Sequence, residues 1–179
     1  MTDFDLVRRT LSGDTLAFTT LADRHTPACL RFASRMLGSR EDAEDVTQDT
    51  LVRAYRALPV FDARTEFRTW LFAILVNRCR SALSVRARRS RWMQADEDAV
   101  QRSAVPSDAA ITELRVELTR ALRMLPAEQR EAFLLKHVEQ LEYTEIADMT
   151  GVQVSALKMR VQRACTRLKQ ELREYDDAV

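Results

Sequence analysis

Glycine and proline are scarce in this chain, and that scarcity constrains the fold more than any other feature of the sequence. Only 3 Gly and 4 Pro occur among 179 residues, so turn signals are few and helix-forming runs are long. Hydrophobic residues make up 46% of the chain, a normal share for a folded protein, so disorder throughout is not expected. We therefore predict an all-α protein.

The helical periodicity is interrupted by an internal stretch over residues 90–110. Gln, Ser, Asp and Pro106 are mixed there without a sustained apolar repeat, which is typical of a flexible linker. The sequence therefore predicts two small helical domains, one over residues 3–89 and another over residues 111–175. Domains of this size bury small cores, so each is expected to have modest stability on its own.

The sequence argues against a membrane span, a disulfide framework and a metal site. No apolar run approaches the roughly 18 residues that a membrane span needs, and residues 1–11 carry charges where a signal peptide would be apolar. The three cysteines, Cys29, Cys79 and Cys165, form no CxxC pair, which fits a reducing compartment. We expect a cytoplasmic protein with no membrane insertion of its own, no metal and no cofactor.

Charges are segregated along the chain although they nearly cancel in sum, at +1. An acidic block contains Glu41, Asp42, Glu44, Asp45 and Asp49. Basic blocks contain Arg86, Arg88, Arg89 and Arg91, and then Lys158, Arg160, Arg163, Arg167 and Lys169. This alternation favours two partner surfaces of opposite sign, with nucleic acid a natural match for the basic ones. For the acidic block alone, compensation of a helix dipole is the simpler interpretation.

In the first domain, apolar spacing predicts helices at residues 4–11, 16–36 and 41–58. Glycines separate these helices, and Pro59 ends the third. A loop over residues 60–66 then leads into a last helix that contains Phe67, Trp70, Leu71, Ile74, Leu75 and Asn77.

The second domain carries the pattern of a helix-turn-helix. An apolar helical stripe consists of Ile111, Leu114, Leu118, Leu122 and Leu125. Pro126 ends this stripe and begins the next helix. A short helix from Tyr143 ends at Gly151, because glycine adopts turn conformations that other residues resist. The final helix has an apolar face made of Leu157, Val161, Ala164 and Leu168. A helix, a glycine turn and a second helix with a basic outer surface predict DNA binding.

The outer face of that final helix holds the candidate DNA contacts. If the apolar face packs inward, helical geometry places five side chains on the outer face: Ser155, Lys158, Met159, Gln162 and Arg163. Arg and Lys pair with guanine edges, and Ser, Lys and Arg also hold phosphates. A solvated amphipathic terminal helix is the alternative, but the basic charge together with the Gly151 turn favours DNA binding.

Runs of residues in both domains resemble a single family. In the first domain they are REDAEDVTQDT at 40–50, AYRAL at 54–58, FRTWL at 67–71 and NR at 77–78. In the second domain they are LP at 125–126, EQREA at 128–132 and the whole of 141–167. The first set resembles region 2, and the second set region 4, of extracytoplasmic-function (ECF, group 4) sigma factors of the sigma-70 family.

The resemblance implies an alternative sigma factor rather than an enzyme. Such a factor binds core RNA polymerase and directs promoter-specific transcription initiation. Region 2 would grip the clamp helices of the β′ subunit and open the −10 element. Region 4 would read the −35 element and contact the β flap. The resemblance also implies control by an anti-sigma factor wedged between the halves, which a flexible linker would allow.

Carried over position by position, the resemblance assigns three sets of residues. Polymerase contacts fall on Asp45, Gln48, Asp49, Arg53 and Arg56. Contacts to the −10 element and its opened strand fall on Phe61, Arg64, Phe67, Arg68, Thr69, Trp70, Asn77 and Arg80. Contacts to the −35 element fall on Ser155, Lys158, Met159, Arg160, Gln162 and Arg163. Core packing is the alternative for Phe67, Trp70 and Phe72.

The helix-turn-helix departs from the family pattern at several positions. Glu142 stands where members commonly have the serine whose hydroxyl caps the first helix, so that cap is lost. Ala156 and Met159 stand in the recognition helix where threonine and serine are common. Because Met159 cannot donate a hydrogen bond, we expect an unusual −35 preference.

Two other classes of protein are compatible with parts of this sequence. A transcription regulator with a helical sensor domain would use the same helix-turn-helix, bind DNA tightly without polymerase and form a dimer, but no dimer zipper is evident. An enzyme on a helical bundle would use His25 and Cys29 as metal ligands. Two ligands are too few, and an ordinary packing or surface role is the simpler interpretation of His25.

Overall fold

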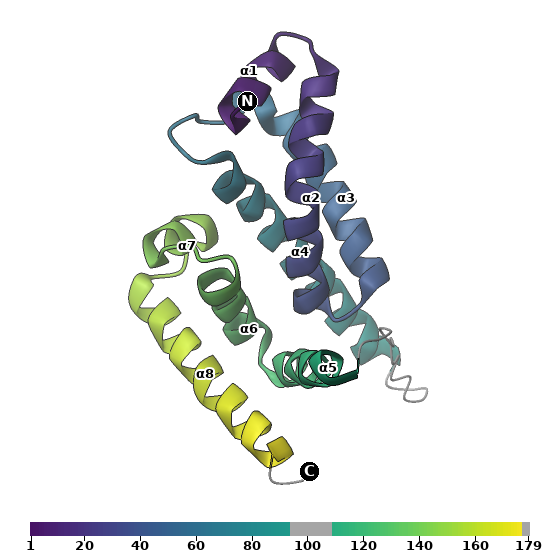
Figure 1. Cartoon of the computed structure of the whole chain (residues 1–179), viewed down its shortest axis with the longest axis vertical. Helices are drawn as coiled ribbons and strands as arrows, with labels where there is room; N and C mark the ends of the chain where they lie inside the picture. The colour runs from purple at the N-terminus through teal and green to yellow at the C-terminus, as the bar shows by residue number, and fades with distance from the viewer. Residues whose placement is uncertain (94–108, 177–179) are drawn as a thin grey trace. The chain divides into compact units, whose positions relative to one another are not determined.

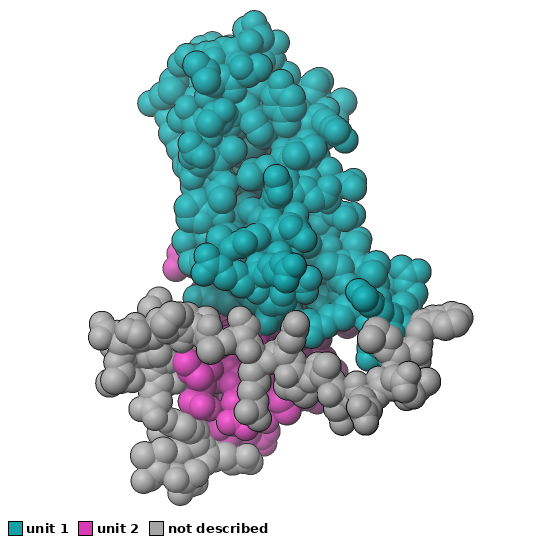
Figure 2. Space-filling model, turned by 90° about the vertical axis from the view of Figure 1, so that its right-hand side faces the viewer, with its two compact units in different colours: residues 1–97 teal, residues 98–179 magenta. Residues whose placement is uncertain are grey.

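The structure of the chain, a computed structural model, describes residues 1–93 and 109–176. The chain divides into two compact units, residues 1–97 and 98–179, shown in different colours in Figure 2. Helices are the only regular elements among the described residues, so the all-α expectation is confirmed. None of the described helices combines the length and the apolar character that crossing a membrane requires.

The first unit consists of α1 (Asp3–Leu11), α2 (Thr15–Leu37), α3 (Arg40–Ala57), the short 3-10 turn η1 (Leu58–Val60) and α4 (Phe67–Met93) (Figure 1). The first three helices begin at side-chain caps, in which Thr2, Asp14 and Ser39 accept hydrogen bonds from backbone N–H groups. Gly38, in the left-handed conformation at φ 73°, ends α2. The chain therefore turns back, and α2, α3 and α4 pack against one another.

The core of this unit lies where α2 and α4 meet. The rings of Phe32 on α2 and Phe72 on α4 are fully buried and approach edge to face, with centroids 5.6 Å apart. The buried side chains of the two helices also include Leu21, Cys29, Met36, Leu71, Leu75 and Cys79. By contrast, α3 buries mostly small side chains, such as Ala43 and Ala54. Its larger polar side chains are therefore left on the surface.

The second unit consists of α5 (Ala109–Met124), α6 (Ala127–Phe133), one π-helical turn η2 (Leu134–Val138), α7 (Tyr143–Thr150) and α8 (Val154–Asp176). The predicted helix-turn-helix corresponds to α7 and α8. Gly151 ends α7 at φ 69° and donates its N–H to the carbonyl oxygen of Ala147 at 2.8 Å. The four side chains of the predicted apolar face of α8 are all buried: Leu157, Val161, Ala164 and Leu168.

The segment expected to link the two domains is helical at both ends. Residues 90–93 continue α4 and residues 109–110 begin α5, while residues 94–108 lie outside the described residues. The side chains of residues 86–90 are exposed, so intrinsic helix propensity and not an apolar stripe extends α4 there. In the stripe predicted for α5, Leu122 and Leu125 are buried and Leu118 is 38% exposed. The side chains of Ile111 and Leu114 are outside the described residues.

The first turn of α7 is capped without the hydroxyl that the family pattern supplies. The carboxylate of Glu145 accepts a hydrogen bond from the backbone N–H of Glu142 at 2.8 Å. The carboxylate of Glu142 in turn accepts from the ammonium group of Lys136 at 3.2 Å. Both negative charges also suit the positive end of the helix dipole. Two glutamates thus replace the missing hydroxyl.

We predict that Gly151→Ala lowers the free energy of unfolding by about 1 kcal/mol, because alanine is strained in the left-handed conformation. A Cβ atom at this position would meet no other atom within 4 Å, so the loss comes from the backbone alone. Gly151→Asn is the matched control, since asparagine tolerates this conformation. Urea unfolding followed by circular dichroism measures both variants. Equal losses in the two would contradict the proposed cause.

Candidate functional site

The residues of α3 predicted to contact polymerase form a polar stripe along the helix. Four of these side chains are exposed, and one is held by ion pairs. The exposed members are Asp45, Gln48, Arg53 and Arg56. The carboxylate of Asp49 is only partly exposed and forms ion pairs with Arg53 at 2.9 Å and with Arg78 of α4 at 2.5 Å. Because Arg78 belongs to a different helix, Asp49 ties α3 to α4.

The electrostatic surroundings of Asp49 favour its charged form. Burial opposes ionisation, but the hydrogen bond from Arg53 and the positive charges of Arg78 and Arg53 outweigh it, so the pKa of Asp49 lies below its ordinary value. Asp49 is therefore ionised near neutral pH, and its charge is matched within the unit. Of the residues predicted on this stripe, Asp49 is the one that the structure shows in an ion pair with another helix.

Two apolar side chains on the exposed side of α3 were missed by sequence reasoning. Val52 is 43% exposed and Tyr55 is 45% exposed. Val52 lies one turn from Asp49 and one turn from Arg56, so it interrupts a stripe of charges. An apolar residue among charged ones on the same helical face is the sequence signal that could have identified Val52 as a candidate contact residue. The ring of Tyr55 meets the ring of Phe18 on α2 edge to face at 4.9 Å.

Three aromatic rings gather where the loop after η1 enters α4. Phe61, Phe67 and Trp70 have ring centroids between 5.0 and 5.8 Å apart. Phe67 is buried, whereas Phe61 and Trp70 are half-buried. Behind Phe67 lies the ring of His25, 5.3 Å away on α2. The cluster therefore presents two partly open rings supported by a buried one.

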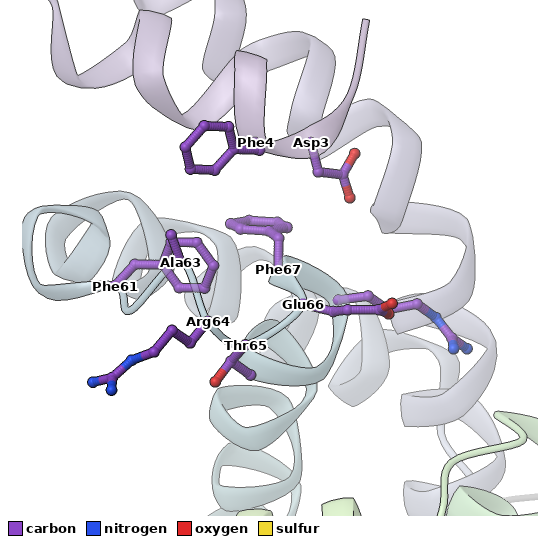
Figure 3. Close-up of a pocket in the computed structure, with 9 residues that line it drawn as sticks. Asp3, Phe4, Phe61, Ala63, Arg64, Thr65, Glu66 and Phe67 are labelled. Carbon is purple, nitrogen blue, oxygen red and sulfur yellow. The ribbon is translucent and has the colours of Figure 1, made fainter.

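A pocket of about 410 Å³ opens beside this cluster, between α1 and the loop before α4 (Figure 3). Its lining consists of Asp3, Phe4, Phe61, Ala63, Arg64, Thr65, Glu66, Phe67 and Arg68. Figure 3 shows Phe4 on α1 across from Phe67. Arg64 forms an ion pair with Asp62 at 2.9 Å, and its hydrogen bond lowers the pKa of that carboxyl. The pocket thus combines apolar rings with groups of both charges, the basic Arg64 and Arg68 and the acidic Asp3 and Glu66.

The other residues predicted for this segment are divided between the core and the surface. Thr69 and Phe72 are buried, so core packing accounts for Phe72. The guanidinium carbon of Arg68 lies 5.2 Å from the centre of the Phe72 ring, within cation–π range. Farther along α4, Asn77 is exposed and Arg80 is half-buried.

The N-terminal helix is joined to this region through Asp3. One carboxylate oxygen of Asp3 accepts a hydrogen bond from Arg24, and the other lies 2.7 Å from Nε2 of the buried His25. His25 therefore has a packing role between α1 and Phe67. In the part of the chain that the structure describes, no three His, Cys, Asp or Glu side chains gather as a metal site would require.

On α8, the side chains predicted to point outward are exposed: Ser155, Lys158, Met159, Gln162 and Arg163. Arg160 differs, because it is 25% exposed and its guanidinium forms an ion pair with Glu128 of α6 at 2.7 Å. The ammonium group of Lys158 lies 5.8 Å from the ring centre of Tyr143 on α7. Arg160 is thus held by an ion pair with α6, whereas the side chains of Lys158 and Arg163 are exposed to solvent.

Comparison with known proteins finds the same two regions in the same order. Residues 21–89 match the family described as Sigma-70 region 2, and residues 115–168 match Sigma-70, region 4. The ECF RNA polymerase sigma-E factor of Salmonella typhimurium is 32% identical over 176 residues, which covers 92% of this chain and 91% of that protein.

Two solved structures are similar to the chain over nearly their whole length. One is the sigma factor RpoE in complex with the anti-sigma factor NepR from Bartonella quintana, with 29% identity and a TM-score of 0.72 over 87% of this chain and 96% of that one. The other is CnrH in complex with the cytosolic domain of CnrY, with 31% identity and a TM-score of 0.71 over 96% of this chain and 97% of that one.

We predict that Asp49→Asn lowers the free energy of unfolding near neutral pH by about 0.5–1 kcal/mol, the size expected of a partly exposed ion pair. A carboxyl whose pKa is lower in the folded than in the unfolded state stabilises the fold above its unfolded pKa. That stabilisation disappears as the pH falls through the folded pKa. The difference between wild type and variant should therefore shrink below about pH 4.

Glu44→Gln is the matched control for this prediction. Glu44 also lies on α3, but it pairs with Arg40 of the same helix, at 2.7 Å, and both side chains are exposed. Urea unfolding at several pH values measures all three proteins. A loss in Asp49→Asn no larger than in Glu44→Gln at neutral pH would contradict a tie between helices.

Proposed function

The chain belongs to the ECF RNA polymerase sigma factors of the sigma-70 family, and from that membership we propose that it binds core RNA polymerase and directs promoter-specific transcription initiation. The observation that carries the proposal is that both matched regions are present in order, each with exposed side chains suited to a partner. Members of this family are transcription initiation factors, so we assign the chain no catalytic activity. Its place of action would be the cytoplasm, where polymerase and promoter DNA meet.

We assign the polymerase contact to the exposed stripe of α3. Asp45, Gln48, Arg53 and Arg56 supply charge and hydrogen bonds, and the exposed Val52 supplies an apolar contact among them. A mixture of an apolar centre and a polar rim is typical of protein interfaces. By family resemblance, the partner is the pair of clamp helices of the β′ subunit. Asp49 would act by holding the stripe in place through Arg78.

We assign −10 opening to the loop before α4 and the first turns of that helix. Extruding a base costs a few kcal/mol, and stacking on an aromatic platform returns roughly 1–3 kcal/mol per base. The partly open rings of Phe61 and Trp70 could therefore offset the opening of one or two bases and no more. The additional free energy must come from polymerase, which holds DNA in a charged channel.

The remaining residues of the −10 set would take two different roles. Phe67 and Thr69 are buried and would support the platform without touching DNA. Arg64 and Asn77 are exposed, while Arg68 and Arg80 are half-buried. These four side chains would contact bases or phosphates along the segment.

We assign −35 recognition to the exposed face of α8, where Ser155, Lys158, Gln162 and Arg163 offer hydrogen bonds to base edges and phosphates. Met159 can contribute only an apolar contact, for example to a thymine methyl group. Arg160 would contact DNA only after its ion pair with Glu128 is broken. The second unit would also contact the β flap.

A regulator that binds DNA without polymerase is the competing function. The net charge of +1 and the small number of basic groups on the exposed face of α8 favour weak and salt-sensitive binding to free DNA. A factor that acts only when polymerase supplies the other DNA contacts fits that charge better.

We predict that the purified chain, added to bacterial core RNA polymerase, starts transcription from a subset of a randomised promoter library that core alone ignores. Sequencing the transcripts would give the −35 and −10 preferences. Tight binding to a DNA site without polymerase, combined with no initiation from any library member, would contradict the proposal.

The library experiment includes a matched pair of recognition-helix variants. Arg163→Ala should lower initiation on the selected promoters by about 5- to 100-fold, the effect of losing one good base contact of about 1–3 kcal/mol. Arg167→Ala removes a charge that is also exposed, one turn farther along α8, and should have a much smaller effect. Equal effects would show that the assignment of Arg163 to the −35 element is wrong.

We further propose that an anti-sigma factor controls the chain. Both similar structures are complexes of this kind, and α5 exposes the apolar side chains of Val116 and Met124. We expect the factor to be isolated from unstressed cells with a bound protein that competes with core polymerase. Isolation of the factor without an inhibitor under every growth condition tried would count against this control.

A further inference from the structure

Lys158, one of the residues assigned to −35 recognition, contacts the first residue of α7. Its ammonium group lies 5.8 Å from the centre of the Tyr143 ring, within the roughly 6 Å over which an aromatic face attracts a cation. Tyr143 begins α7 and is half-buried, whereas Lys158 is exposed. The fold therefore gives a flexible and exposed side chain of α8 a neighbour that is held in place.

A second ammonium group lies at the same ring, and its charge is compensated by a carboxylate. Lys136 of η2 lies 5.0 Å from the centre of the Tyr143 ring and donates to both carboxylate oxygens of Glu142 at 3.2 Å. Two uncompensated positive charges close to one ring would repel each other. Glu142 stands where members of the family commonly have an uncharged serine, so this compensation comes from a residue particular to the chain. It allows Lys158 to stay at the ring beside Lys136.

The contact with Tyr143 distinguishes two basic residues of the exposed face of α8. Residues three and four apart lie on one side of a helix, so Lys158 shares a row with Ser155 and Gln162, and this row lies toward α7. Arg163 lies in a neighbouring row. Among the residues that the structure describes, no aromatic ring lies within cation–π range of Arg163. The same helix thus carries one basic side chain with a ring beside it and one without.

A fixed neighbour matters more for lysine than for most side chains that meet DNA. Lysine carries its ammonium group on a flexible four-carbon stem with three rotatable donors, and ordering such a side chain on binding costs conformational entropy. An unrestrained ammonium group would also pair with any phosphate within reach, and phosphate contacts carry no sequence information. A lysine held in place before DNA binds is therefore better suited to select one base.

We propose that Tyr143 is a positioning residue that holds Lys158 beside α7, so that the ammonium group reads one base of the −35 element instead of ranging over phosphates. The base that suits this donor in the major groove is guanine, which presents two acceptors, N7 and O6. Tyr143 sharpens this guanine preference through Lys158. The inference rests on the proposed function, because it requires α8 to read the −35 element.

The test uses holoenzyme made from the full chain and core polymerase, on a promoter library with a fixed −10 element and randomised −35 bases. Lys158→Ala identifies the position that Lys158 reads, because the guanine preference disappears there. At that position, Tyr143→Leu should lower the ratio of initiation on guanine to initiation on the other bases by about 2- to 5-fold. This change corresponds to about 0.5–1 kcal/mol, the cation–π attraction expected at an exposed site. Tyr143→Phe should keep the wild-type ratio because it keeps the ring.

Phe133→Leu is the matched control, since it removes another half-buried ring of the second unit, one that meets the His137 ring at 5.0 Å. It should leave the ratio unchanged, which separates the loss of a positioning contact from a general loss of stability. Tyr143→Leu should also leave unchanged the preference at the position identified by Arg163→Ala. In the double variant Tyr143→Leu/Lys158→Ala, the ratio should equal that of Lys158→Ala, because Tyr143 acts through Lys158.

The possible failures are distinguishable. If Tyr143→Leu keeps the wild-type ratio, or lowers the preference equally at the Arg163 position, the positioning role is wrong and the proposed function stands. If Tyr143→Phe loses as much of the ratio as Tyr143→Leu, the hydroxyl group acts instead of the ring and the inference is wrong. If Lys158→Ala changes the preference at no position, Lys158 reads no base and the inference fails while initiation continues. If the wild-type chain initiates from no library member, the proposed function itself fails.

Discussion

The buried ring of Phe67 connects the parts of the first unit that matter for function. It contacts His25 of α2 on one side and the half-buried rings of Phe61 and Trp70 on the other. His25 in turn contacts Asp3 of α1. Without this ring, Phe61 would keep its contact with Trp70 but lose the buried ring behind it, and surface loops with few buried contacts are more mobile. The platform proposed for promoter opening is therefore supported by a residue that is itself buried.

The same division between support and contact recurs on α3 and α8. On α3, Asp49 is bound to Arg78 of a neighbouring helix, and the side chains around it remain exposed. On α8, Arg160 is bound to Glu128 of α6, while Lys158 and Arg163 face solvent. In each helix one charged residue is used to fix the element. A small domain has a small apolar core with which to fix the orientation of its helices. Ion pairs between helices therefore contribute to fixing that orientation.

Much of the fold could be predicted from spacing along the chain. The apolar face of α8 was predicted correctly because helical geometry places residues three and four apart on one side. The end of α7 was predicted from Gly151, since few other residues adopt its backbone conformation. The last turn of α4 and the start of α5 were not predicted. Helix propensity extends both elements beyond their apolar stripes, and propensity is a weak signal on its own.

The sequence by itself determined the all-α class, the two matched regions and the face of α8 that points outward, because each depends on local periodicity or on contiguous motifs. Only the tertiary structure decided which candidate residues are free to meet a partner. Phe67 and Thr69 are buried, Asp49 and Arg160 are held by ion pairs with other helices, and Phe4 lies at a pocket formed with residues about 60 positions away. The physical reason is that burial, ion pairing and pocket lining join residues distant in sequence, and no local pattern records those contacts.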